Sequence, residues 1–369
     1  MAKNIILCCD GTSNQFAGDQ TNVIRLYRCA PSIPGQQVTF YDPGVGTMPA
    51  PGLPTRVAKR ISVSLGLAIG LGFTDNIRDA YCFLMQEFEP GDQVFLFGFS
   101  RGAFTARALA GMLHAVGLLH PGTENLVPYA IRYWRNCYTS AGSKVAADFK
   151  RTMSRECKPH FIGLWDTVGS VGWFNNFQTF PHTRHNPDVA IVRHAVSIDE
   201  RRCCFRHNLV EVDRNNSKQD VQNVWFAGVH ADVGGGYPEA ESGLSKIALE
   251  WIAREAKAAG MIVEDNILAV QLGARPDPAG TQHSPPSPAG MLHQSLHGFW
   301  WVLELLPRRQ WHPADHRMHW SWGPNRPRRM PSQPLLHPSV LERERLDPRY
   351  HPCNLEGLPD TVAQSLSPS

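Results

Sequence analysis

The 369-residue sequence lacks a hydrophobic run long enough to cross a membrane. Its longest apolar stretch, residues 61–73, is short and is interrupted by three glycines. The N-terminal apolar run, residues 5–9, is too short for a signal-peptide core and is followed by Asp10 instead of a small-residue cleavage site. We therefore expect a protein made in the cytoplasm, without a signal peptide or a transmembrane helix.

Paired cysteine motifs and a large net charge are also missing. The nine cysteines include no C-x-x-C pair, which excludes the common zinc and redox motifs and favours reduced, buried thiols. The net charge of +3 is too small to indicate nucleic-acid binding. His312, His316 and His319 have helical spacing, which we interpret as a polar face and not as a zinc site. We expect no metal and no cofactor.

The apolar pattern alternates between short buried strands and longer helical segments. Such alternation predicts an α/β fold, with a mostly parallel sheet and helices on both faces. The predicted strands are 5–9, 38–41, 94–97, 160–165 and 221–227. The predicted helices are 21–28, 57–88, 103–110, 127–137 and 242–259, whereas 189–198 is read as helical or mixed.

The composition changes after residue 273. Sixteen of the 29 prolines lie from Pro276 onward, and so do five of the ten tryptophans. So much aromatic surface favours a segment that packs on the rest of the chain. We expect a catalytic domain at 1–273 and a Pro- and Trp-rich extension or cap at 274–369, packed on the same domain.

Residues 92–107 carry the strongest chemical motif of the sequence. An apolar strand leads into Gly98-Phe99-Ser100-Arg101-Gly102, and a helical pattern follows. This is the form of a nucleophile elbow, in which G-x-S-x-G joins a strand to a helix and exposes the serine hydroxyl at the top of the sheet. Ser100 is therefore the predicted nucleophile.

A serine nucleophile needs a general base and an acid that orients it, in the chain order Ser, Asp, His in α/β-hydrolases. Asp166 directly follows the strand 160–165, and His230 lies just beyond the strand 221–227. We predict Asp166 as the acid and His230 as the base. The rival bases and acids are His194, His207, Asp199 and Asp232, of which Asp232 is also expected at the edge of the site.

The loop after the first strand supplies the other expected site residues. The N–H of Arg101 is the first predicted oxyanion donor, and Gly11 and Thr12 are the candidates for the second. Asp10 is expected at the site edge, where it would alternatively hold this loop in shape. Asp10-Gly11-Thr12 also resembles the aspartate loop of phosphatases, but that chemistry needs a second acid where positions 8 and 12 are Cys and Thr.

Four segments together resemble one protein family: residues 9–14, 98–104, 163–169 and 225–237. They are similar to the DUF2235 family, the Tle1-like catalytic domain of type VI secretion phospholipase effectors. The resemblance implies an α/β-hydrolase fold and a triad of Ser100, Asp166 and His230. It also implies phospholipase activity, delivery by a secretion system that needs no signal peptide, and a secretion-apparatus or immunity protein as partner.

We therefore expect a serine hydrolase that cleaves ester bonds, with a lipid substrate and transient contact with a membrane surface. Two alternatives stay open at this point. One is an esterase or thioesterase with a non-phospholipid substrate, and the other is a catalytically idle binding module that keeps the fold.

Overall fold

The computed structural model describes residues 2–11, 20–44, 72–168, 180–213, 216, 218–298, 300–305, 308–312, 317–321 and 324–355. The predictions for Thr12, His316 and the first part of the helix 57–88 lie outside these residues. So does most of the apolar stretch 61–73.

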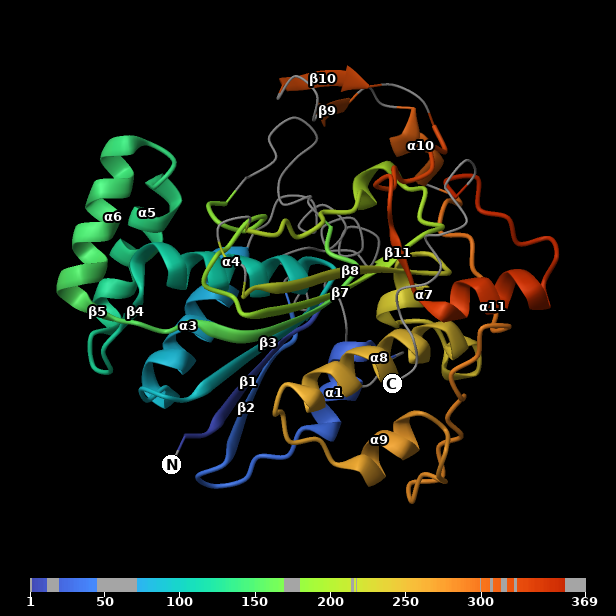
Figure 1. Cartoon of the computed structure of the whole chain (residues 1–369), viewed down its shortest axis with the longest axis horizontal. Helices are drawn as coiled ribbons and strands as arrows, with labels where there is room; N and C mark the ends of the chain where they lie inside the picture. Colours follow the sequence, from blue (N-terminus) through green and yellow to red (C-terminus); the bar gives the residue numbers. More distant parts are fainter. Residues whose placement is uncertain are drawn as a thin grey trace, which may run out of the picture.

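A seven-stranded sheet forms the centre of the molecule, and every neighbouring pair of strands is parallel (Figure 1). The strand order is β11-β8-β7-β6-β3-β1-β2. The strands are β1 (Asn4–Cys9), β2 (Gln37–Asp42), β3 (Gln93–Phe99), β6 (Pro159–Trp165), β7 (Ile191–Ser197), β8 (Asp220–Phe226) and β11 (Leu335–Leu336). The predicted fold class is confirmed.

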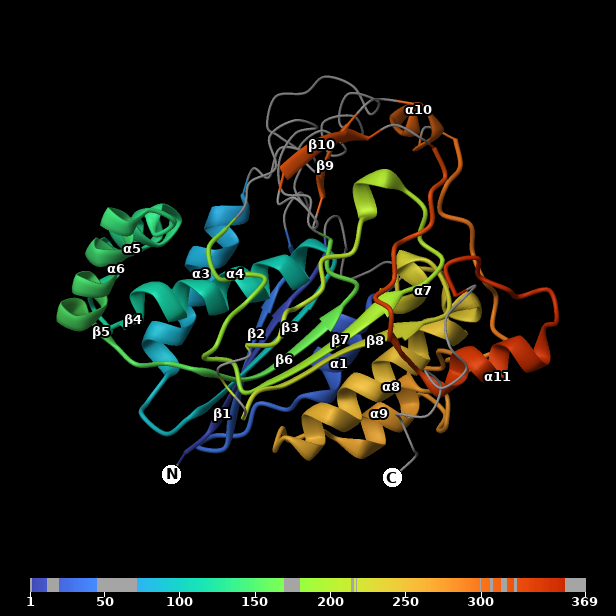
Figure 2. The same cartoon turned by 45° about the horizontal axis from the view of Figure 1, so that its top comes forward.

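Helices cover both faces of the sheet, as the alternation of buried side chains requires. In β1, Ile5 and Leu7 join one apolar core, while Ile6 and Cys8 join the core on the opposite face. The first core lies under α3 (Phe73–Glu87), α4 (Arg101–Val116), α5 (Val127–Asn136) and α6 (Ser140–Met153). The second lies under α1 (Asn22–Cys29), α8 (Gly243–Ala258) and α9 (Asp265–Gln271) (Figures 1 and 2).

Chain order reverses between β1 and β3, which are neighbours in the sheet. β1 connects to β2 at one edge, and the chain then returns to the other side of β1 to form β3. In open parallel sheets the crevice beyond such a switch point is where ligands bind. The elbow at the end of β3 therefore stands at the position that the topology favours for a site.

The prediction of a helical or mixed segment at 189–198 is wrong, because β7 is a strand inside the sheet. Its polar side chains obscure the pattern of a buried strand. Arg193 is held by Glu255 at 2.6 Å, and His194 is held by Asn223 at 3.0 Å. Each polar group is paired, so the strand tolerates burial on both faces.

The C-terminal segment adds a strand to the sheet. β11 pairs with β8, and α11 (Pro338–Leu346) follows it directly. A third apolar cluster joins the segment to the sheet through Trp225, Leu336, Val340 and Tyr350.

The remaining elements are short. They are β4 (Leu118–Leu119), β5 (Ser154–Arg155), α7 (His230–Gly234), α10 (Trp300–Glu304), β9 (Arg308–His312) and β10 (Arg317–Ser321), with 3-10 turns at Glu124–Leu126, Cys203–Phe205 and Glu239–Glu241. His312 and His319 lie in the two strands of the β9–β10 hairpin, so the helical spacing predicted for them is wrong. Among the described residues there is no helix both long and apolar enough to span a bilayer.

Candidate active site

Ser100 is the single residue between β3 and α4. Its backbone has φ 58° and ψ −117°, a conformation that costs energy in any residue other than glycine. Strand and helix nearly touch here: a Cβ on Gly102 would lie 2.0 Å from the carbonyl oxygen of Cys9, and one on Gly98 would lie 2.4 Å from that of Gly102. The two glycines of the motif are thus required by backbone contact, as a nucleophile elbow needs.

Asp166 follows β6 directly and is fully buried, with a φ of 41°. Its Oδ1 accepts the N–H of Ser197 at 2.9 Å, and its Oδ2 bonds Nδ1 of His230 at 2.6 Å. Arg328 donates to both carboxylate oxygens. Burial alone would raise the pKa of Asp166, but the charge of Arg328 and the bond to His230 outweigh it and hold that pKa well below its usual value.

His230 is the first residue of α7, just beyond the end of β8. Its ring packs against two aromatic rings, with centroid distances of 4.6 Å to Phe99 and 4.9 Å to Phe205. Its backbone N–H donates to Glu200 at 3.2 Å. Burial lowers the pKa of His230, partly offset by Asp166, so the ring is neutral near pH 7 and can accept a proton. Since Asp166 takes Nδ1, Nε2 is the nitrogen left for this task.

The three residues lie at the carboxyl ends of β3, β6 and β8, at one edge of the sheet. The backbone N–H of Ser100 donates to the carbonyl of Trp165 at 3.0 Å, directly before Asp166. Within the described residues no hydrogen bond joins the Ser100 hydroxyl to His230. Such bonds are often long before a substrate binds. The arrangement has the parts for nucleophilic acyl transfer: a strained serine, a neutral imidazole and an oriented acid.

The residues expected to stabilise an oxyanion have different surroundings. Arg101 is the first residue of α4. The N–H groups in the first turn of a helix point out of the N-terminal end of that helix, and the N–H of Arg101 is one of them. The N–H of Gly11, in contrast, donates to Oδ1 of Asp10 at 2.6 Å. Gly11 would have to break that bond to serve an oxyanion.

Asp10 is buried and organises the first loop. Its Oδ2 accepts the hydroxyls of Thr21 at 2.7 Å and Tyr41 at 2.8 Å, while its Oδ1 accepts the N–H of Gly11. These bonds account for its carboxylate as a support of the loop after β1. This is the alternative that the sequence left open for Asp10.

Among the described residues, Asp232 bonds groups other than the ring of His230. Its Oδ2 accepts the N–H of Val229 at 3.0 Å and so caps α7, while its Oδ1 bonds Nδ1 of His293 at 2.6 Å. It positions the helix that carries His230 and ties it to the segment around His293.

Two of the rival residues, His194 and Asp199, are held by hydrogen bonds to other groups. His194 accepts the N–H of Thr167 on Nε2 and bonds Asn223 on Nδ1, so both ring nitrogens are occupied. Asp199 accepts the N–H of Gly228 at 2.7 Å and the hydroxyl of Tyr350 at 2.9 Å. His207 packs its ring edge-on against Trp225.

Sequence reasoning missed three residues that contact the proposed pair. Arg328 lies against Asp166, Glu200 holds the N–H of His230, and Phe205 packs on its ring. Glu200 is itself buried and is held by Arg202, whose guanidinium lies 3.6 Å from the ring of Phe205. No local pattern in the sequence marks Arg328.

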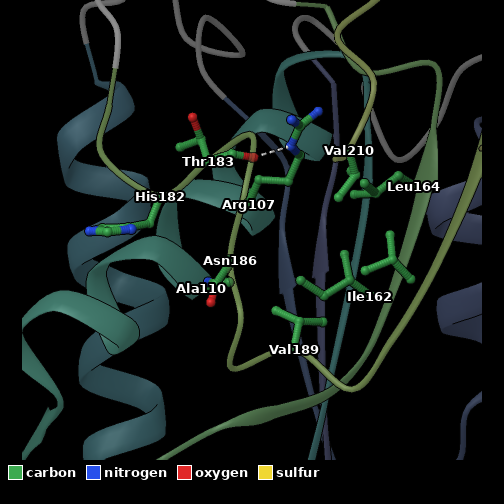
Figure 3. A pocket seen from close by; sticks show the side chains of 10 residues that line it. Arg107, Ala110, Ile162, Leu164, His182, Thr183, Asn186, Val189 and Val210 are labelled. Carbon is green, nitrogen blue, oxygen red and sulfur yellow. Dashed lines mark hydrogen bonds between the residues drawn. The ribbon is translucent and has the colours of Figure 1, made fainter. Parts of the chain in front are cut away.

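A small cavity lies beside α4, and Ser100 is not among the residues that line it (Figure 3). Its volume is about 20 Å³, room for about one water molecule. Arg107 reaches over it and donates to the carbonyl of Thr183 at 2.6 Å. Most other lining side chains are aliphatic and come from α4, β6, β7 and neighbouring loops, while the loop 180–189 also contributes His182, Thr183 and Asn186. The cavity is a packing defect and not a substrate pocket. The described residues contain no group of three or more His, Cys, Asp or Glu side chains placed to hold a metal ion.

One protein family matches the larger part of the chain. Residues 3–255 match the family described as "T6SS, Phospholipase effector Tle1-like, catalytic domain". The chain is 40% identical over 223 residues to the uncharacterized protein YEL023C of Saccharomyces cerevisiae, which covers 55% of this chain and 32% of that protein.

Two solved structures are similar at lower identity. An uncharacterized protein from Pseudomonas aeruginosa has 20% identity and a TM-score of 0.42, over 71% of this chain and 46% of that one. A Tle1 effector bound to the VgrG spike of the type 6 secretion system has 18% identity and a TM-score of 0.37, over 66% of this chain and 52% of that one. The chain spans only about a third of the yeast relative and about half of each solved chain.

Proposed function

Because the chain belongs to the family of type VI secretion phospholipase effectors with a Tle1-like catalytic domain, we propose that it is a serine hydrolase that cleaves carboxylic ester bonds of phospholipids. Ser100 is the nucleophile, His230 the general base and Asp166 the acid that orients the base. The observation that carries the proposal is the 2.6 Å bond between Asp166 and His230, at the sheet edge where the strained Ser100 stands.

The proposed reaction proceeds in two steps. Nε2 of His230 takes the proton of the Ser100 hydroxyl as the oxygen attacks the ester carbonyl, and the same proton then passes to the leaving alcohol. The product is an acyl-enzyme on Ser100. His230 next removes a proton from water, which attacks the acyl group and releases the fatty acid as the proton returns to Ser100.

Charge on the carbonyl oxygen peaks in each tetrahedral intermediate. The N-terminal end of α4 carries the positive end of the helix dipole, and the Arg101 N–H belongs to that end. Donors held in this way are typically worth about 10²–10³ in rate. Arg101 therefore remains the proposed first donor, while Thr12 and Gly11 remain proposals for the second.

A lipid hydrolysis panel tests the proposal. The wild type should release fatty acid from phospholipid vesicles, and Ser100→Ala and His230→Gln should each reduce release by at least about 10³-fold. Ser245→Ala is the matched control, because Ser245 in α8 is also buried and its hydroxyl donates to the carbonyl of Ser242, directly before that helix. It should keep wild-type activity.

Other outcomes separate the alternatives. Turnover of short soluble esters alone would favour a non-phospholipid esterase and refute the phospholipase. Failure to hydrolyse any ester or thioester would favour an idle binding module. A secretion-apparatus or immunity protein partner and transient membrane contact stay predictions that follow from the family.

A further inference from the structure

Arg328 is among the most deeply buried charged residues of the described chain, with 1% of its surface exposed. It lies in the Pro-rich C-terminal segment, 162 residues after Asp166 in the sequence. Its Nη1 and Nη2 donate to Oδ1 and Oδ2 of Asp166, which is the paired geometry in which a guanidinium binds a carboxylate most firmly.

Backbone and side-chain acceptors hold the guanidinium from the other side. Nη1 donates to the hydroxyl of Ser197 at 2.8 Å and to its carbonyl at 3.1 Å, and Nη2 donates to the carbonyl of Phe205. Ser197 ends β7, and Phe205 packs on the ring of His230. Arg328 thus joins β6, β7 and the 3-10 turn at Cys203–Phe205 around the carboxylate that bonds the ring of His230.

We propose that Arg328 is a positioning residue of the active site, which fixes the carboxylate of Asp166 so that Oδ2 meets Nδ1 of His230. The inference rests on the proposed function and extends it, because it makes the segment after residue 273 part of the catalytic unit. Without the two hydrogen bonds from the Arg328 guanidinium, the carboxylate of Asp166 would keep only its bonds to the N–H of Ser197 and to His230.

The charge of Arg328 has a second effect, on proton uptake. Adding a proton to the Asp166–His230 pair costs more beside a buried positive charge than without it. Among the described residues, the other charged or titratable groups near the pair are Glu200 with its partner Arg202, and the buried imidazoles His194 and His207. Removal of Arg328 must therefore raise the pH at which the pair takes up its proton.

Three variants test the proposal, each measured as the rate of fluorophosphonate labelling across pH 5 to 9. Arg328→Met removes the charge and the fork, and Arg328→Lys keeps the charge but not the fork. Arg343→Met is the matched control, because Arg343 lies in the same segment, is buried to 6% exposure and donates only to the carbonyls of Pro288 and Gly290. Thermal unfolding reports the folding of each variant.

Arg328→Met should label about 10 to 100 times more slowly than the wild type. The acid limb of its pH–rate profile, where labelling slows as the pair takes up a proton, should move up by about one pH unit. Arg328→Lys should label about tenfold more slowly with the limb near its wild-type position. Arg343→Met should keep both rate and limb, whatever it costs in stability. In the wild type the limb should lie below the ordinary histidine pKa of about 6.5.

Several results would overturn the role of Arg328. The first is an acid limb of the pH–rate profile that stays at its wild-type pH in Arg328→Met. The second is Arg328→Lys with a wild-type labelling rate, or with an acid limb that moves as far as in Arg328→Met. The third is an equal slowing of labelling in Arg343→Met. If Arg328→Met does not fold, the labelling of Arg328→Lys and the acid limb of the wild-type pH–rate profile test the proposal instead. A wild-type acid limb above pH 7 refutes the proposal. A wild type that does not label at all would overturn the proposed function itself, whereas normal labelling with any of the results above would overturn only Arg328.

Discussion

The close approach of β3, β1 and α4 makes Gly102→Ala the sharpest test of the elbow. A Cβ at this position would lie 2.0 Å from the carbonyl oxygen of Cys9 and 2.4 Å from that of Asp10. Ordinary contact begins at about 3.4 Å, so the backbones would have to separate by about 1.4 Å. Neither atom belongs to a flexible side chain that could turn aside.

This displacement has two measurable consequences. Overpacking of a buried site typically costs about 1–3 kcal/mol, and a rigid backbone contact favours the upper end of that range. A shift of about 1 Å between reacting groups also lowers rates by about 100-fold. We expect Gly102→Ala to lose about 3 kcal/mol in urea unfolding and to label with fluorophosphonate about 100 times more slowly.

The matched control is Gly243→Ala, at the first turn of α8. A Cβ there would meet its nearest neighbours at 3.4–3.6 Å, which is ordinary contact. We expect a change within about 0.5 kcal/mol and unchanged labelling. If Gly102→Ala matched this control in both measurements, α4 would not lie against β1 as described and the elbow reasoning would be wrong.

Two further predictions concern buried carboxylates. Asp166→Asn should slow labelling by about 10³–10⁴-fold, and more than a tenth of the wild-type rate would count against Asp166 as the acid. Burial raises the pKa of Asp199 to about 6, against about 3.9 in an unfolded chain. Between these two pH values the folded protein binds a proton that the unfolded chain does not. The stability therefore falls as pH rises from about 3.9 to about 6. Asp199→Asn should therefore add about 1–3 kcal/mol at pH 8 and little at pH 4 in urea unfolding, and equal effects at both pH values would refute this reasoning.

Local patterns were enough to predict the elements that carry the site. The elbow is readable because strand, glycine spacing and helix follow one another within 16 residues. Asp166 and His230 are readable because each follows a strong apolar strand, and parallel strands bring their carboxyl ends to one edge. The bond between these two side chains agrees with the predicted roles, which labelling and hydrolysis have yet to test.

The missed features depend on distant partners. β7 was obscured by Arg193 and His194, whose burial is possible only because Glu255 and Asn223 pair with them. Arg328 has no signal in its own segment, since its partner Asp166 is 162 residues away. The bond from the Gly11 N–H to Asp10 is local, but it depends on a side-chain rotamer that sequence does not specify.

The most direct test of the central claim is the site of covalent modification by a fluorophosphonate probe. The intact protein is labelled at pH 8, digested, and the modified residue identified by mass spectrometry. We expect a single modification on Ser100, abolished in Ser100→Ala and strongly slowed in His230→Gln. No modification, or one that persists in Ser100→Ala, would contradict the assignment of Ser100 as the nucleophile.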